Sequence, residues 1–514
     1  MELGANREND IANTERFTTP APDAQENRSE VEVILVIAPD TETSMESSAE
    51  HLLRELIDRT GLRRDQPAVA QVARMQTRTV HSDAGRFTPQ APRSLAETGL
   101  EDHQLEALIL RFLLNRGAAS GAGIAKQVRL PFAMVSEFLR GLKESQLVAH
   151  RRSSGALGDF EYQLTDKGID QSRRFAAQST YFGAAPVPFA DYVTAVTAQS
   201  VSKETITQQR LHAALADLSL SDEMLSRLGQ AMTAGRALFL FGLPGNGKTS
   251  IAERLTAAFG SEIWIPRAIL CDGDIVRVYD PMLHVEVATS GLTQADEIDQ
   301  RWICIRRPTI VVGGELTMDN LEITVNQTVG ILEAPLQLKS NCGTLVIDDF
   351  GRQRMSPDQL LNRWIVPLEK QHDYLNFPSG KKVQIPFDQV IVFSTNLDPS
   401  RLVDEAFLRR IPYKIEARDP SEAEFRTMFK AMADKYGITF IESSVDYLLA
   451  RHYRCVNRPL RYCHPRDLML QIKHLCEYHQ LPREMTPKHV DIAVSNYFGA
   501  VPIPPTVAAQ GLSA

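Results

Sequence analysis

The sequence has few cysteines and tryptophans, no excess of positive charge and no long apolar run. Six cysteines and three tryptophans are scattered through 514 residues, which is typical of reduced thiols rather than of a disulfide framework. We find no apolar run of about eighteen residues, the length that a membrane-spanning helix needs. The formal net charge of −8 argues against wholesale wrapping of nucleic acid, although a local basic patch stays open.

Two further features bear on location and metal binding. The N-terminal stretch MELGANRENDIANTERF is polar and is unlike a secretory signal, so we expect a cytoplasmic protein with no membrane contact. A group of cysteines and histidines near the C-terminus invites a metal-site interpretation, but its spacing matches no standard zinc pattern, and simple packing is preferred. Its members are Cys455, Cys463, His464, Cys476 and His479.

A phosphate-binding loop of the Walker A pattern GxxxxGK[ST] is predicted within residues 237–259. The apolar run ALFLF precedes the turn GLPGNGKT, and a helical pattern follows it, which is the strand–loop–helix context that this motif requires. Lys248 is expected to contact the β- and γ-phosphates of ATP, and the Thr249 hydroxyl to take a Mg²⁺ position. The predicted nucleotide-binding residues are Gly242, Leu243, Pro244, Gly245, Asn246, Gly247, Lys248, Thr249 and Ser250.

A second apolar strand, GTLVIDDF at residues 343–350, ends in two carboxylates. This is the Walker B pattern, in which Asp348 is expected to bind Mg²⁺ and Asp349 to act as the general base that orients the attacking water. Asp349 is one methylene shorter than the usual glutamate. With this shorter side chain the protein could hydrolyse ATP more slowly, or it could be a nucleotide-gated scaffold with little turnover.

These motifs, in this order, resemble those of the AAA+ ATPases, and the resemblance covers residues 203–499. VIVFSTN resembles the sensor-1 strand, which implies that Asn396 contacts the attacking water or the γ-phosphate. EAFLRRI resembles the element that presents an arginine finger to a neighbouring subunit; Arg410 is favoured, with Arg409 beside it. HPRDL resembles sensor 2 and implies that Arg466 is directed at the γ-phosphate.

Residues 330–345 and a hairpin expected at 364–386 resemble the bacterial helix-two-insert branch, which includes MoxR-type chaperones and enhancer-binding activators. The chain lacks the GAFTGA loop of those activators, which counts against a role in opening sigma-54 polymerase complexes. The resemblance implies a ring homo-oligomer, with a hexamer expected.

The predicted fold class is α/β: a P-loop NTPase AAA+ core with a parallel sheet flanked by helices, and a C-terminal helical lid. We expect a disordered N-terminus and a small segment of one strand and one helix before the first linker. The predicted divisions are 1–30 and 31–62 for those two parts, 63–100 and 179–202 for linkers, 203–419 for the core, 420–499 for the lid and 500–514 for the tail.

Residues 101–178 are predicted to form three helices and a two-stranded hairpin, which resembles a winged helix-turn-helix. Read as a DNA-binding module, its third helix would enter the major groove, with Arg151 and Arg152 on the wing. The exposed face of that helix is mixed in sign, with Ser136, Glu137, Arg140, Lys143 and Glu144. DNA binding and protein docking are therefore equally favoured.

The function predicted from these patterns is ATP hydrolysis with Mg²⁺ that remodels a protein partner, in a chaperone-like manner, by a ring of identical subunits. One alternative is an AAA+ motor or transcriptional regulator that acts on nucleic acid through residues 101–178. The other alternative is the nucleotide-gated scaffold. The sequence does not name the protein substrate.

Overall fold

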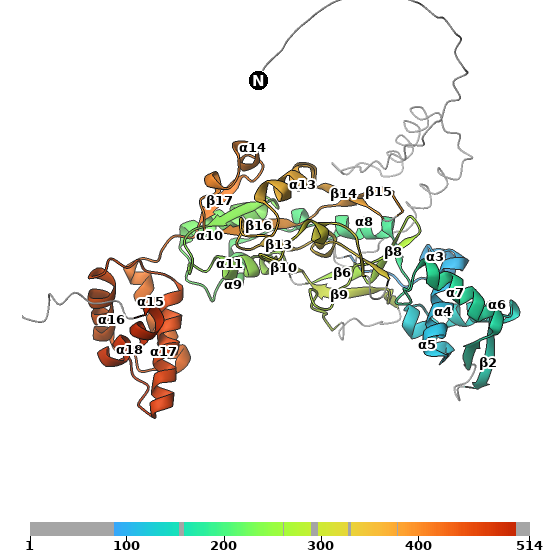
Figure 1. Ribbon diagram of the computed structural model, residues 1–514, viewed down its shortest axis with the longest axis horizontal. Helices are drawn as coiled ribbons and strands as arrows, with labels where there is room; N and C mark the ends of the chain where they lie inside the picture. The colour runs from blue at the N-terminus through green and yellow to red at the C-terminus, as the bar shows by residue number, and fades with distance from the viewer. Residues whose placement is uncertain are drawn as a thin grey trace, which may run out of the picture. The chain divides into compact units, whose positions relative to one another are not determined.

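The computed structural model describes residues 87–153, 159–260, 262–288, 297–326, 330–377 and 379–499 (Figure 1). The chain divides into two compact units, Met1–Thr79 and Val80–Ala514, and every described residue belongs to the second. The predictions for residues 1–30, 31–62 and 500–514, and most of those for 63–100, lie outside the described residues.

A five-stranded parallel sheet forms the centre of the nucleotide-binding core, with the order β10-β13-β16-β5-β17. Its strands are β5 (Leu238–Phe241), β10 (Thr309–Val312), β13 (Thr344–Ile347), β16 (Val390–Thr395) and β17 (Tyr413–Glu416). β13 and β16 are buried along their whole length, because helices cover both faces of a parallel sheet. The predicted α/β class with a parallel sheet is therefore confirmed.

Alternate residues of β5 enter two separate cores, one on each face of this sheet. Phe239 packs with α13 (Pro357–Lys370) and with Phe350 and Phe393, whose ring centroids lie 5.9 and 5.2 Å from its own. Leu238 and Leu240 pack on the other face, against helices that flank the phosphate loop in the sequence. Those helices are α9 (Gln208–Ala214), α10 (Asp222–Thr233) and α11 (Lys248–Leu255).

The long segment between the phosphate loop and Asp348 supplies four strands of a second sheet, of order β11-β12-β8-β7-β4, and β4 comes from before the loop. Its strands are β4 (Val187–Pro188), β7 (Ala268–Cys271), β8 (Asp274–Arg277), β11 (Thr324–Asn326) and β12 (Ile331–Glu333). A further antiparallel pair joins β6 (Glu262–Pro266) to β9 (Trp302–Arg306). Strands therefore occur where the sequence alternates between residues 272 and 326.

Two predicted segments differ in detail from the structure. Residues 187–198, within the predicted linker at 179–202, form β4 and the helix α8 (Phe189–Ala198). The hairpin expected over 364–386 begins later, because residues up to Lys370 continue α13. The hairpin itself is β14 (His372–Asn376) paired antiparallel with β15 (Lys382–Pro386).

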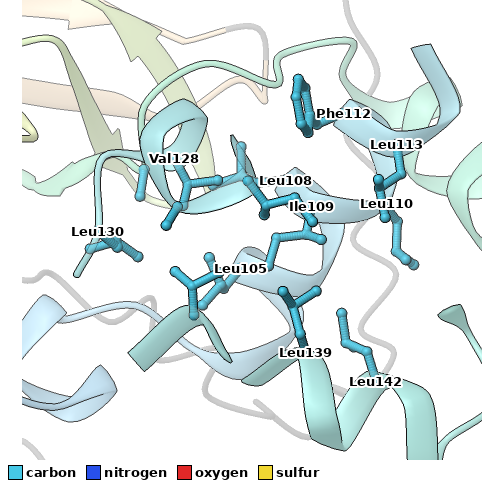
Figure 2. Packing of buried hydrophobic residues seen from close by; sticks show 14 of the residues in the cluster. Leu105, Leu108, Ile109, Leu110, Phe112, Leu113, Val128, Leu130, Leu139 and Leu142 are labelled. Atoms are coloured by element: carbon cyan, nitrogen blue, oxygen red, sulfur yellow. The ribbon is translucent and has the colours of Figure 1, made fainter. Parts of the chain in front are cut away.

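Residues 101–178, here called the N-terminal module, contain four helices and a three-stranded antiparallel sheet of order β1-β3-β2. In Figure 2, leucine and isoleucine side chains of α4 face Leu139 and Leu142 of α6 and form its core. The elements are α4 (Asp102–Arg116), β1 (Ala118–Ser120), α5 (Gly121–Val128), α6 (Phe132–Glu144), β2 (Val148–Ser153), β3 (Phe160–Leu164) and α7 (Asp166–Gln178).

Side-chain hydrogen bonds fix the start of α7 and tie the segment just before the module to the residue that precedes β9. Thr165 caps α7, because its hydroxyl accepts a hydrogen bond from the Gly168 N–H. Buried Arg301 pairs with Asp299 at 2.8 Å and donates to the carbonyl oxygen of Thr98 at 2.9 Å. The module's core cluster also includes Ala268 of β7.

The C-terminal region is helical, as predicted. Its helices are α15 (Glu422–Tyr436), α16 (Glu442–Leu448), α17 (Cys463–His479) and α18 (Pro487–Phe498). Ser421 caps α15 in a capping box with Glu424, and α17 begins at Cys463. Among the described residues, no helix is both long enough and apolar enough to span a bilayer.

Candidate functional site

The predicted site lies at the carboxyl ends of three adjacent strands of the parallel sheet. The phosphate loop follows β5, Asp348 and Asp349 follow β13, and Asn396 follows β16. In the strand register Thr395 pairs with Phe241, and Phe393 with Ile347. Parallel pairing therefore brings three segments that are far apart in the sequence to one edge of the sheet.

Three glycines of the loop have a backbone conformation that side-chain-bearing residues rarely adopt. The φ angles are 141° at Gly242, 86° at Gly245 and 75° at Gly247. A Cβ at Gly242 would lie 2.5 Å from the Ala417 carbonyl oxygen, and one at Gly245 would lie 2.6 Å from Cys463 Sγ. A Cβ at Gly247 would meet nothing within 4 Å. Gly242 and Gly245 thus permit packing of the loop on the rest of the chain, and Gly247 permits the turn itself.

The side chain of Lys248 is held at the centre of the site by uncharged groups. Its residue is 7% exposed, and Nζ donates to the carbonyl oxygens of Gly242 at 2.9 Å and Leu243 at 3.1 Å and to Asn396 Oδ1 at 2.7 Å. Burial lowers the pKa of Lys248, and the charges of Asp348 and Asp349 oppose that effect. Among the described residues Lys248 forms no salt bridge, so its charge has no direct ionic partner.

Each of the two carboxylates accepts a hydrogen bond from another predicted site residue. Thr249 Oγ1 donates to Asp348 Oδ2 at 2.8 Å, and Asn396 Nδ2 donates to Asp349 Oδ1 at 2.9 Å. Asp349 has a φ of 48°, a left-handed conformation that aspartate tolerates better than most residues. The predicted residues Lys248, Thr249, Asp348, Asp349 and Asn396 therefore form one hydrogen-bonded network.

The three predicted arginines lie outside this network. Arg466 is 59% exposed and pairs with its neighbour Asp467 at 2.8 Å. Arg410 donates to Glu369 at 2.7 Å and to the Ala406 carbonyl oxygen at 2.9 Å. Arg409 is exposed, and its side chain has no hydrogen bond or ion pair with any residue that the structure describes.

The structure brings other residues, which the motif analysis did not single out, to the phosphate loop. Asn246 Nδ2 donates to Asp419 Oδ1 at 2.7 Å, and the same carboxylate is paired with Arg461. The Cys463 N–H donates to the Gly245 carbonyl oxygen at 2.9 Å. The charge of Arg461 contributes to the lowered pKa of Lys248. The sequence does not identify Arg461 as a site residue, because Arg461 precedes α17 and belongs to no recognised motif.

A second supporting residue, Gln353, holds the turn after β13. Its Nε2 donates to the carbonyl oxygens of Asp348 at 2.9 Å and Asp349 at 3.2 Å. The Asp349 N–H in turn donates to Asp348 Oδ1 at 3.0 Å. These contacts fix the backbone that presents both carboxylates. No sequence signal identifies this glutamine.

Comparison with known proteins gives a partial match and several distant likenesses. Residues 421–496 match the family model described as "Domain of unknown function (DUF8689)". No curated protein matches the chain.

Solved structures with a detectable likeness include the Holliday junction branch migration motor RuvB of Thermotoga maritima, with 12% identity over 55% of this chain and 71% of that chain and a TM-score of 0.34. NtrX of Brucella abortus in complex with ATP has 12% identity over 64% of each chain and a TM-score of 0.34. A model of the complex between subunits BchI and BchD of magnesium chelatase has 14% identity over 57% of this chain and 92% of that chain, with a TM-score of 0.29.

At TM-scores this low, these likenesses carry no argument about function. The fold class rests on the chain's own topology: a parallel sheet flanked by helices, a phosphate loop after its β5 strand and a helical C-terminal region, which together are an α/β fold.

Proposed function

We propose that this chain binds ATP with Mg²⁺ and hydrolyses it at the network of Lys248, Thr249, Asp348, Asp349 and Asn396. The observation that carries the proposal is the environment of Lys248. Its ammonium group is buried but contacts only carbonyl and amide oxygens. A buried cation without a direct ionic partner is costly, and an anionic ligand at the loop would compensate for it.

The chemistry of the donor set also suits the proposed cofactors. The Thr249 hydroxyl and the Asp348 carboxylate place two oxygen atoms 2.8 Å apart, and oxygen ligands are those that Mg²⁺ prefers. Bound Mg²⁺ would supply charge stabilisation on the phosphate oxygens. Thr249 and Asp348 would hold the ion, and Lys248 would bind the phosphates.

Asp349 and Asn396 have the remaining chemical roles in this proposal. Asp349 is exposed, so water reaches its carboxylate, which would accept the proton of the attacking water. Asn396 contacts both Lys248 and Asp349, at 2.7 and 2.9 Å. It would therefore set the orientation of the base relative to the phosphate-binding lysine.

Among the arginines, the contacts favour Arg461 as the lid residue at the site. Arg461 shares the Asp419 carboxylate with Asn246 of the loop, whereas Arg466 is paired with Asp467. We accordingly assign Arg461, rather than Arg466, to the stabilisation of bound phosphates. A guanidinium suits this task because its fork of N–H groups matches phosphate oxygens.

A ring of identical subunits, hexameric by analogy with the family it resembles, would complete the site in trans. Arg410 is engaged by Glu369 within its own subunit, whereas Arg409 is exposed. The more accessible guanidinium is therefore the better candidate for a finger that reaches a neighbouring site.

The proposed work of the ring is remodelling of a protein partner. The nucleic-acid alternative has less support, because the exposed positions of α6 include two acids and two bases. They are Glu137, Arg140, Lys143 and Glu144. A phosphate-binding helix face would carry an excess of lysine and arginine.

Binding and turnover assays test the proposal. ATP–Mg²⁺ should bind the unaltered chain and a Lys430→Ala control, whose lysine is exposed, but not Lys248→Ala. Asp349→Asn should still bind ATP but lose turnover by about 10²-fold or more, as expected for removal of a general base. Equal ATP affinity in Lys248→Ala would contradict the site, and background turnover in the unaltered chain would favour the scaffold alternative.

A further inference from the structure

A second concentration of positive charge lies in the N-terminal module and shares no lining residue with the site described above. It is a cavity of about 990 Å³ bounded by α4, β1, α5 and the β2–β3 hairpin, together with Ala184, which precedes β4, and Arg267, which lies between β6 and β7. Five cationic side chains and one carboxylate line it: Arg116, Lys126, Arg129, Arg152, Arg267 and Glu161. The whole chain has a net charge of −8, so this local balance is unusual.

Most of these positive charges have no partner. Arg152 Nε pairs with Glu161 Oε2 at 2.6 Å, which accounts for the one carboxylate. In the part of the chain that the structure describes, the side chains of Arg116, Lys126 and Arg129 make no hydrogen bond and no ion pair. Counting Arg267, four positive charges in the cavity are therefore not balanced by its lining.

Arg267 shows the cost of this arrangement most clearly. Its Nε atom is buried and has no hydrogen-bond partner among the described residues, while its guanidinium lies over the Tyr279 ring, 5.4 Å from the centroid. Burial lowers the pKa of Arg267, and the charge of Arg129 lowers that pKa further, with Glu286 in partial opposition. An unsatisfied buried donor costs stability, so the fold holds Arg267 at this position against an energetic penalty.

The backbone holds the two central arginines in place. The Arg267 N–H donates to the Arg301 carbonyl oxygen at 2.9 Å, and the Arg267 carbonyl oxygen accepts from the Val278 N–H at 3.1 Å. Arg129 has a φ of 60° at the C-terminal cap of α5, a conformation that is unfavourable for arginine. The convergence of their charges is therefore built into the fold.

The nearby helix end does not explain the cavity. At the N-terminus of α5 the Asp159 carboxylate already accepts the N–H of Gly121 at 2.8 Å, and Ser120 Oγ accepts that of Gly123 at 3.0 Å. The backbone donors there are taken. Any anion in the cavity would be bound by the arginine and lysine side chains.

We propose that this cavity binds a small ligand that carries at least two phosphate groups. A phosphate monoester carries about −1.5 to −2 at neutral pH, so two are needed to balance four positive charges. Guanidinium groups bind phosphate oxygens in bidentate pairs. Among the lining residues the aromatic ring belongs to Phe112, which is 6% exposed, so the cavity offers no open ring face on which a base of single-stranded nucleic acid could stack.

The position of the cavity gives the ligand a structural consequence. Four of the cations belong to the N-terminal module, and Arg267 belongs to the turn between β6 and β7. A ligand that contacts both groups would join the module to the second sheet. Its binding would therefore stabilise that junction.

The test uses inorganic tripolyphosphate as the probe and the full chain carrying Lys248→Ala, so that the phosphate loop does not compete. Isothermal titration calorimetry should detect binding, and Arg116→Gln with Arg267→Gln should weaken it by about tenfold or more for each guanidinium removed. The matched control is Arg140→Gln with Arg174→Gln, which removes two exposed arginines of the same module outside the cavity. The control should bind within about twofold of the parent.

Equal affinity in the cavity variant and the parent, or equal loss in cavity and control variants, would overturn the proposal. Arg116 is exposed, so Arg116→Gln alone should fold and should weaken binding by itself. In the chain with an intact Lys248, Arg116→Gln should remove one class of tripolyphosphate site and leave the other. Single-stranded and duplex oligonucleotides form the second arm: binding of these that depends on Arg116 and Arg267, without binding of tripolyphosphate, would also overturn it.

Discussion

Replacement of Arg461 by glutamine should weaken ATP binding far more than the same replacement of Arg466. Arg461 is 12% exposed and pairs with Asp419, which also accepts from Asn246 of the phosphate loop. Arg466 is 59% exposed and pairs only with the adjacent Asp467. The two variants remove the same charge from positions five residues apart in sequence.

The difference in magnitude follows from the two environments. In the proposed role the Arg461 guanidinium donates to a bound phosphate. A hydrogen bond to a charged group is worth about 1.5–3 kcal/mol, and we take the lower limit because solvent reaches this site. A loss of about 1.5 kcal/mol lowers affinity about tenfold. Arg466 is paired with Asp467 and is 59% exposed, so it contacts no phosphate in this assignment. The loss of one solvent-screened charge in Arg466→Gln should lower affinity only about twofold.

Calorimetric titration of ATP–Mg²⁺ into the full-length variants measures both effects. Asp419→Asn is the companion variant, because asparagine retains an acceptor for Asn246 and removes the charge that Arg461 contacts. Arg461→Gln and Asp419→Asn should be non-additive when combined, since they break one shared interaction. Equal losses in Arg461→Gln and Arg466→Gln, or a larger loss in the latter, would refute the assignment of Arg461 to the site.

Three further predictions follow from the described contacts. Gly242→Ala should destabilise the fold by more than about 1 kcal/mol, because alanine is strained at positive φ. Gly141→Ala, on the exposed side of α6, should instead stabilise the fold by about 0.5–1 kcal/mol. Urea unfolding measures both changes in the free energy of unfolding. Burial lowers the pKa of His464 to about 4, so the unfolded chain takes up the proton first as pH falls. Stability should therefore drop between about pH 6.5 and 4, by at most about 3 kcal/mol, and His464→Gln should not show that drop in melts at pH 7 and 5. Arg409→Ala subunits mixed with unaltered ones should reduce ATP turnover more than dilution allows, and Arg410→Ala subunits should not; the reverse order would reject Arg409 as the finger.

The core of the candidate site could be predicted because its parts are local motifs. A strand, a glycine-rich turn and a helix start are encoded within a few residues, and so are the two acids that follow an apolar strand. The expected side chains of Lys248, Thr249, Asp348, Asp349 and Asn396 do meet in the structure. Parallel pairing of the strands places these motifs together whatever the length of chain between them.

The contacts of the arginines could not be read from local motifs in the same way. Which arginine near the start of α17 faces the phosphate loop depends on where that helix begins, and it begins at Cys463, three residues before Arg466. The first turn then directs Arg466 to solvent, while Arg461 precedes the helix and meets Asp419. A shift of a few residues rotates a helical side chain to a different face, and helix boundaries are set by capping contacts that a pattern does not specify.

The cationic cavity could be predicted from the sequence even less than the contacts of these arginines. Sequence alone determined the α/β class, the phosphate loop and the acidic strand, because periodicity and short motifs are properties of neighbouring residues. Only the tertiary structure decided that Arg267 lines the same cavity as Arg129 and Arg116, since these residues belong to separate elements with no shared pattern. Packing between distant parts of the chain brings such residues together. That packing depends on the whole buried core rather than on any one stretch of the sequence.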